Sequence, residues 1–122
     1  MDKVKPDVQE YMKDENRCLQ EWYRAYYSSE LYPGEPCAVL PGIDKMKESF
    51  ENWTRSKQKK LFNLICVEWN YPAKHKDTKF QDKILLASSL TDFLISCVMQ
   101  IPSPITTAVL LVRMGLENFC DL

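Results

Sequence analysis

The feature that most constrains this chain is a long apolar stretch towards its C-terminal end. Across residues 84–116 the only charged residues are Asp92 and Arg113. Pro102 and Pro104 interrupt the stretch, and proline ends a helix because its nitrogen carries no proton to donate. The stretch therefore predicts two apolar helices joined by a short connection, which makes them antiparallel neighbours.

Three environments would suit this apolar hairpin. We favour the centre of the domain, where the earlier helices would cover it. A second interpretation is that part of its surface stays bare for a partner or for a second copy of the chain. The third is insertion into a membrane, which we disfavour because a spanning helix needs about twenty apolar residues and neither arm provides them.

Two further helices are predicted by apolar residues that recur at three- and four-residue steps, the pattern of one buried helical face. The first covers residues 6–28 and starts at Pro6, a residue that suits the first helical position. The second covers residues 44–69, with Asp44 as its N-cap.

The two arms of the hairpin are predicted as helices over residues 79–100 and 104–119. A chain of 122 residues buries about two-thirds of the surface that its unfolded form exposes, so it needs neither disulfides nor metal to fold. Only three glycines are present, which weighs against a β fold rich in tight turns. We therefore expect residues 1–122 to form a single all-α domain of four helices.

Between the first two helices lies a loop, residues 29–43, that contains three prolines and two glycines. A loop of this length is long for a compact domain, and such loops are often functional. We expect residues 37–40 within it to pack against the core.

The five cysteines indicate free thiols in a reducing compartment. Their number is odd, no C-x-x-C pair occurs, and the polar N-terminal residues do not form a signal peptide. Cys18, Cys66 and Cys97 fall on apolar helical faces, where reduced cysteine packs as a small hydrophobic residue. We therefore expect a cytoplasmic protein.

Three segments carry a resemblance to known proteins: residues 65–71 (ICVEWNY), 101–104 (IPSP) and 111–120 (LVRMGLENFC). They resemble small uncharacterised bacterial proteins, cyanobacterial ones especially, in which an apolar helix, a proline break and a second helix end in a Gly-Leu-x-x-apolar-Cys pattern. The resemblance covers roughly the second half of the chain. It implies a bacterial, cytosolic protein and assigns no functional residue.

Charge is distributed unevenly, although the net charge is only −1. Residues 1–52 hold seven basic and eleven acidic residues, whereas residues 53–83 hold eight basic and three acidic ones. Such a basic segment can contact phosphates or an acidic partner, although we favour a solvated helix face that pairs with the acidic first helix. The candidate patch consists of Arg55, Lys57, Lys59, Lys60, Lys74 and Lys76.

A dense aromatic cluster forms a second candidate site. Its members are Trp22, Tyr23, Tyr26, Tyr27 and Tyr32. Tyrosine and tryptophan are favoured at protein interfaces, and they also pack cores and their rims. Both interpretations stay open, and we take the cluster as a candidate protein interface.

No pattern in the sequence requires catalysis, a metal or a cofactor. His75, the only histidine, lies in a predicted basic loop, residues 73–79, without an apolar anchor, so we expect an exposed loop histidine and not a catalytic base. Closely spaced cysteine and histidine pairs, which structural zinc sites use, are lacking. We therefore predict no catalytic residue, no metal ligand and no cofactor.

The function that these observations favour is a non-enzymatic protein-interaction or oligomerisation module of a bacterial cytosolic protein. It would act on a protein partner or on a second copy of itself. The alternative is a nucleic-acid-binding accessory protein that uses the basic middle segment. An enzyme with an unrecognised site is the least favoured class.

Overall fold

The computed structural model describes residues 5–97 and 99–121, and all the regular structure in these residues is helical. The prediction of an all-α fold is confirmed. The predicted number of four helices is wrong, because the structure divides the long predicted helices into shorter ones. Eight α-helices, two π-helices and one 3-10 helix occur in the described residues.

The first predicted helix, residues 6–28, is divided at Asp14 into α1 (Pro6–Lys13) and α2 (Glu15–Tyr26). The backbone of Asp14 is not helical, and its carboxylate accepts a hydrogen bond of 3.1 Å from the backbone N–H of Arg17. This carboxylate is therefore the N-cap of α2. A π-helix, η1 (Tyr27–Leu31), extends α2 beyond the predicted end.

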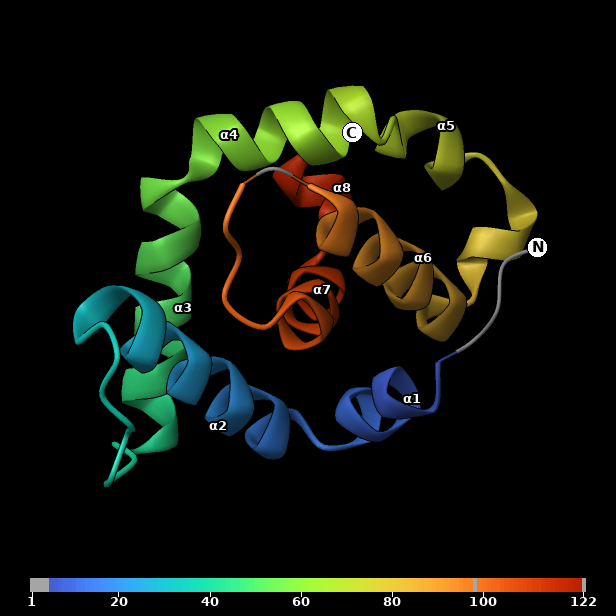
Figure 1. Cartoon of the computed structure of the whole chain (residues 1–122). Helices are drawn as coiled ribbons and strands as arrows, with labels where there is room; N and C mark the ends of the chain where they lie inside the picture. The colour runs from blue at the N-terminus through green and yellow to red at the C-terminus, as the bar shows by residue number, and fades with distance from the viewer. Residues whose placement is uncertain (1–4, 98, 122) are drawn as a thin grey trace.

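The second predicted helix, residues 44–69, consists of α3 (Ile43–Ser56), α4 (Gln58–Phe62) and a π-helix, η2 (Asn63–Glu68). Lys57 separates α3 from α4, with φ −106° and ψ 12°. This one non-helical residue turns the chain through the corner that Figure 1 shows between α3 and α4.

The predicted basic loop is partly helical. It contains α5 (Tyr71–His75) and the 3-10 helix η3 (Thr78–Gln81). Asn70, in the left-handed region with φ 59°, ends the preceding π-helix and starts α5. Asparagine tolerates this conformation better than most residues.

The hairpin arms are shorter than predicted. The first is α6 (Lys83–Ser96), capped by the Asp82 carboxylate, which accepts from the backbone N–H groups of Ile84 and Leu85. The second is divided at Gly115 (φ 103°) into α7 (Pro104–Met114) and α8 (Leu116–Phe119). Glycine permits this positive φ without steric conflict.

Helix α7 lies at the centre of the fold (Figure 1). Helices α1, α2 and α6 pack against it, and Figure 1 shows α3 and α4 completing the frame around it. Residues 106–112 of α7 are buried at every position. The hydroxyls of Thr106 and Thr107 are buried too, and they donate hydrogen bonds to the backbone carbonyls of Ser103 and Pro102.

Ion pairs fasten the outer helices to this centre. The guanidinium of Arg113, on α7, donates to the Glu15 carboxylate at 2.9 Å and to the Met12 carbonyl at 2.8 Å, and so holds the α1–α2 corner. Lys5 pairs with Asp92 of α6 at 2.9 Å. Among the described residues, no helix is long and apolar enough to cross a membrane.

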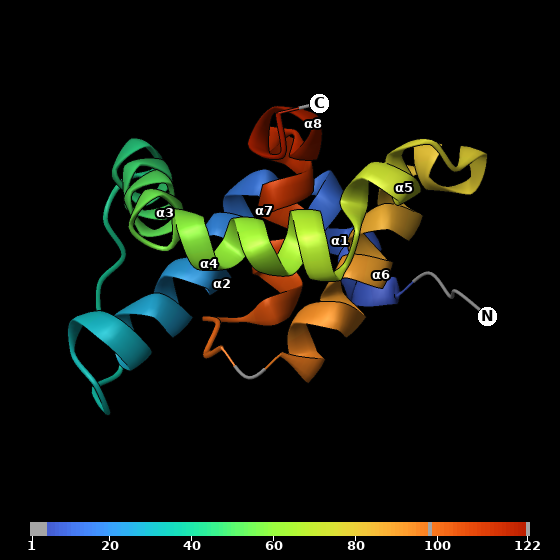
Figure 2. The ribbon, with the colours of Figure 1, turned by 90° about the horizontal axis from the view of Figure 1, so that it is seen from above.

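A disulfide joins Cys66 of η2 to Cys120, directly after α8, across 54 residues of sequence. The prediction of five free thiols is therefore wrong for Cys66 and Cys120. Both cysteines are buried, and the bond holds α8 over one end of α7 (Figure 2). Cys18, Cys37 and Cys97 are free.

The disulfide is expected to stabilise the fold. Replacing Cys66 and Cys120 together by serine should lower the free energy of unfolding by about 4 kcal/mol, because the unfolded chain regains the entropy of a long open loop. Urea unfolding followed by circular dichroism measures this change. Cys37→Ser, at a partly exposed free cysteine, is the control and should change the free energy by less than about 0.5 kcal/mol. Equal stability of the double variant and the wild type would contradict the expectation.

Candidate functional site

Trp22 is a core residue. It is 0% exposed, its ring stacks on Tyr26 at 4.8 Å, and it meets the rings of Phe50 and Trp53 edge-on at 5.0 and 5.9 Å. These contacts join α2 to α3. Trp22 therefore cannot contact a partner in this fold, and its assignment to a protein interface is corrected.

The four tyrosines of the cluster extend from this core to the surface. Tyr23 and Tyr26 pack against the core, Tyr23 and Tyr27 lie 6.3 Å apart between ring centroids, and the Tyr27 ring lies 4.8 Å from that of Tyr32. Tyr32 is 54% exposed. Only the outer end of the predicted interface is thus open to a partner.

Tyr32 belongs to a segment that exposes both apolar and acidic side chains. We name residues 30–39 the acidic loop, since Glu30 and Glu35 are exposed within it. We expected residues 37–40 to pack against the core, but Val39 is 82% exposed, so the expectation is wrong for Val39. Leu31 and Tyr32 are the other large exposed apolar residues of the acidic loop.

The predicted basic patch is divided into two parts. Arg55, Lys57, Lys59 and Lys60 lie at the corner of α3 and α4, whereas Lys74 and Lys76 lie beyond η2, on α5 and at its end. The Lys74 ammonium lies 4.7 Å from the centre of the Trp69 ring and donates to the Trp69 carbonyl. Lys74 is therefore held by its own chain.

The first part of the patch surrounds a groove of about 920 Å³. We name it the basic groove. Arg55, Lys57, Lys59 and Lys60 line it together with the apolar side chains of Phe62 and Val67, which are 37% and 58% exposed. The described lining contains no acidic residue.

The π-helix explains why apolar side chains face this groove. Along η2 the hydrogen bonds join residues five apart, as between the Trp69 N–H and the Leu64 carbonyl at 2.8 Å. Phe62 and Val67, also five apart, come to the exposed side, while Ile65 is buried on the opposite side. Single π-turns within helices are frequent at functional sites.

The cations of the basic groove differ in whether the described residues pair with them. Lys57 pairs with Glu30 at 3.9 Å, and Arg55 donates to Asn52. Lys59 and Lys60 form no ion pair within residues 5–97 and 99–121. The favoured interpretation was a solvated helix face that pairs with the acidic first helix; both lysines are exposed as it expects, but the described residues do not show the pairing.

A smaller groove of about 400 Å³ continues from the basic groove. The two share Arg55, Gln58 and Phe62, and the smaller groove extends to Met114 and to Phe119 of α8. Exposed apolar surface thus continues from Val67 across Phe62 to Met114. The disulfide fixes the α8 wall of this surface.

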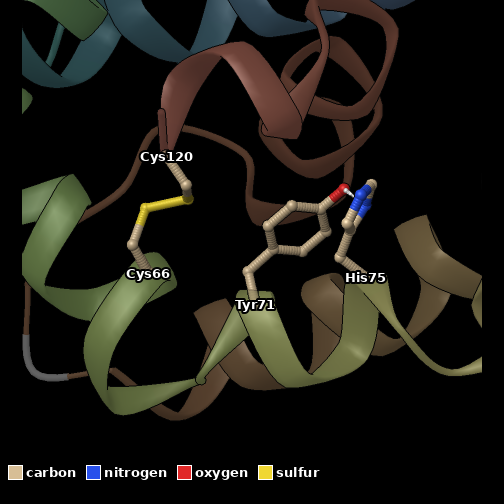
Figure 3. Close-up of a disulfide and its surroundings, with 4 residues drawn as sticks. All are labelled: Cys66, Tyr71, His75 and Cys120. Carbon is tan, nitrogen blue, oxygen red and sulfur yellow. Dashed lines mark hydrogen bonds between the residues drawn. A yellow bond between two sulfur atoms is a disulfide. The ribbon is translucent and has the colours of Figure 1, made fainter. Parts of the chain in front are cut away.

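A polar cluster lies beside the disulfide (Figure 3). Tyr71 and His75 come from α5, and the Tyr71 hydroxyl lies 3.3 Å from Nδ1 of His75. The Glu117 carboxylate of α8 lies 3.8 Å from both His75 Nδ1 and Lys83 Nζ. His75 is thus placed at the end of a helix and has defined partners, unlike the isolated loop histidine of the prediction.

The pKa values in this cluster favour a structural role. Burial, followed by the charge and hydrogen bond of Glu117, raises the pKa of Tyr71 to about 12. A backbone hydrogen bond to its own carboxylate, and the nearby Lys83, lower the pKa of Glu117. At neutral pH the tyrosine is therefore a neutral donor and the glutamate an anionic acceptor, an arrangement that fastens α8 to α5.

Cys18 and Cys97 are not activated as nucleophiles. Burial raises the pKa of the Cys18 thiol to about 12, and burial and Glu68 raise the pKa of Cys97. A reactive cysteine needs a lowered pKa. In the part of the chain that the structure describes, no group of three or more His, Cys, Asp or Glu residues is placed to hold a metal ion.

Comparisons with models of protein families, with curated proteins and with solved structures find no match to this chain. The resemblance to small bacterial proteins therefore remains a prediction, and the site is interpreted from its own geometry.

The sequence predicted the cations of the basic groove but did not predict that Phe62 and Val67 line it. Residues 61–69 are apolar at most positions, so periodicity did not separate the exposed Phe62 and Val67 from their buried neighbours. The available signal was that Phe62 and Val67 follow the run of Arg55, Lys57, Lys59 and Lys60 within the same predicted helix.

Because Trp22 is buried and Tyr32 is exposed, we expect their replacement to have very different effects on stability. Trp22→Ala should lower the free energy of unfolding by about 3–5 kcal/mol, the usual cost of removing a buried large aromatic side chain. Tyr32→Ala should lower it by less than about 1 kcal/mol, because this ring is half exposed. Chemical denaturation of both variants measures the difference. Similar losses in the two variants would contradict the placement of Trp22 in the core.

The raised pKa of Tyr71 predicts a loss of stability at alkaline pH. The fold favours the protonated hydroxyl, so this contribution is complete below the ordinary pKa of 10.0 and is lost as the pH rises towards about 12. Thermal unfolding between pH 9 and pH 12 measures the effect. Tyr71→Phe, which has no hydroxyl to ionise, should lose less stability over this range than the wild type. Parallel pH profiles of the two proteins would contradict the assignment.

Proposed function

We propose that the protein is a non-enzymatic interaction module and that its basic groove binds an acidic segment of a protein partner that also presents large apolar side chains. The observation that supports this proposal is the combination of Lys59 and Lys60, without ion partners among the described residues, with the exposed Phe62 and Val67. Charge would attract and orient the segment, and the apolar contact would supply most of the affinity.

A protein partner explains the groove better than a nucleic acid does. A nucleic-acid surface needs cations spread along a continuous path, with aromatic rings on which bases stack. Here the cations divide at η2, Lys74 contacts Trp69, and Phe62 is the only aromatic residue among the described residues that line the groove. Binding to nucleic acid is the alternative outcome of the experiment below.

We propose a bacterial cytoplasm as the location, on the basis of the sequence resemblance. The Cys66–Cys120 disulfide weighs against this location, since disulfides are rare in reducing compartments. The oxidation state of these two cysteines in intact cells, trapped by alkylation at lysis, distinguishes a cytoplasmic location from an oxidising one.

The proposal predicts selective binding of an acidic amphipathic probe. The probe is a fluorescein-labelled synthetic peptide of glutamate and leucine, and its controls replace either all glutamates by glutamine or all leucines by alanine. Fluorescence anisotropy should show binding of the first peptide and much weaker binding of both controls. Double-stranded DNA and single-stranded RNA of similar charge serve as competitors, and stronger binding of either would reject the protein-partner proposal.

Substitutions locate the binding to the basic groove. Lys59→Glu with Lys60→Glu should weaken peptide binding at least about ten-fold, because two attractions become repulsions. Phe62→Ser with Val67→Ser should weaken it similarly through lost apolar contact. The matched control, Lys45→Glu with Lys76→Glu, makes the same change of charge at two exposed lysines outside the groove and should change the affinity less than about two-fold. Equal effects of the two charge reversals would exclude the basic groove as the site.

A further inference from the structure

The large apolar residues that remain exposed gather mainly in two places. Among the described residues, three belong to the acidic loop and three to the basic groove and its continuation. The loop contributes Leu31, Tyr32 and Val39, and the grooves contribute Phe62, Val67 and Met114. Exposed apolar surface of this kind, next to charged residues, is typical of interaction sites.

The acidic loop has a defined shape before it meets any partner. The Ser28 hydroxyl donates to the Glu35 carbonyl at 2.8 Å, and the backbone N–H of Gly34 donates to the Ser28 carbonyl at 3.0 Å. Tyr32 is held against the ring of Tyr27. A segment ordered in this way loses little conformational entropy on binding.

The loop and the groove complement each other in charge as well as in apolar surface. Glu30 is engaged by Lys57 of its own chain, which leaves Glu35 as the acidic side chain of the loop with no ion pair in the described part of the chain. The groove correspondingly leaves Lys59 and Lys60 for an external anion. Within the described residues, the loop thus presents an unpaired carboxylate, and the groove presents two unpaired ammonium groups.

We infer that the segment bound in the basic groove is the acidic loop of a second copy of this chain. In this contact Glu35 faces Lys59 and Lys60 of the other copy, and Tyr32 and Val39 cover Phe62 and Val67. This inference rests on the proposed function of the groove and names its partner.

The position of the two surfaces favours a closed dimer. The pair of Glu30 and Lys57, at 3.9 Å, shows that the start of the loop borders the start of the groove. Figure 1 shows the loop segment beside α3, the helix that leads into the corner with α4. Adjacent complementary surfaces can pair twice about a two-fold axis, so that each loop occupies the groove of the other copy. Two contacts double the buried area, which a single short loop would leave below that of a standard interface.

The test is an exchange of charges across the contact. Glu35→Lys and, separately, Lys59→Glu with Lys60→Glu should each raise the dissociation constant of the dimer at least about ten-fold, because each places like charges together. The triple variant that combines these substitutions places opposite charges together again and should recover the dimer. Lys45→Glu with Lys76→Glu is the matched control and should leave the dimer unchanged. Analytical ultracentrifugation across a concentration series measures the molar mass and the dissociation constant.

Recovery by the triple variant cannot arise from misfolding, so it separates a specific contact from loss of structure. A wild type that remains monomeric throughout the series, or a triple variant that associates no better than its parents, would overturn the inference. An open chain of copies instead of a dimer would overturn the two-fold arrangement.

If the glutamate and leucine peptide still binds to a monomeric wild type, the proposed function stands and only the second copy is rejected. If that peptide binds neither the wild type nor the Glu35→Lys variant, whose groove is unoccupied, the proposed function fails as well.

Discussion

The whole fold depends on the burial of α7. Every position of residues 106–112 is buried, and such a helix has no polar face that could meet water. Neighbouring helices must therefore cover α7 on all sides. A chain of this length can surround it only if its long helices are broken into shorter ones. The breaks at Asp14, Lys57 and Gly115 turn the chain around it. The frame in Figure 1 is thus the consequence of one apolar helix.

This dependence explains which parts of the fold the sequence could predict. The periodicity identified the buried faces, since Leu19, Met46 and Phe50 are buried as the apolar pattern indicates. The corners were missed because the local signals were weak or ambiguous. Asp14 is a good N-cap but lies inside an uninterrupted helical pattern, and Lys57 favours helices by itself. The chain bends at Lys57 because α3 and α4 must surround α7. This is a requirement of tertiary packing, which local sequence signals do not contain.

The candidate site was predictable only in part, for a similar reason. Residue types alone identified the cations, but the apolar floor depends on η2, whose π geometry selects Val67 rather than Ile65 for exposure. The pairing of Cys66 with Cys120 could not be predicted either, because five cysteines with wide spacings specify no connectivity. The disulfide and the cluster of Tyr71 and Glu117 fix α8, which then forms one wall of the groove surface.

Although the net charge is near zero, several acidic residues form ion pairs that join one element to another. Glu15 joins α2 to Arg113 and Lys47, Glu117 joins α8 to Lys83, and Asp92 holds Lys5. These acids are committed to ties between elements that surround α7, so they are not available to neutralise Lys59 and Lys60. Lys59 and Lys60 form no ion pair among the described residues, and they lie beside the exposed Phe62 and Val67. These are the side chains that the proposed contact uses to hold the acidic loop of a second copy.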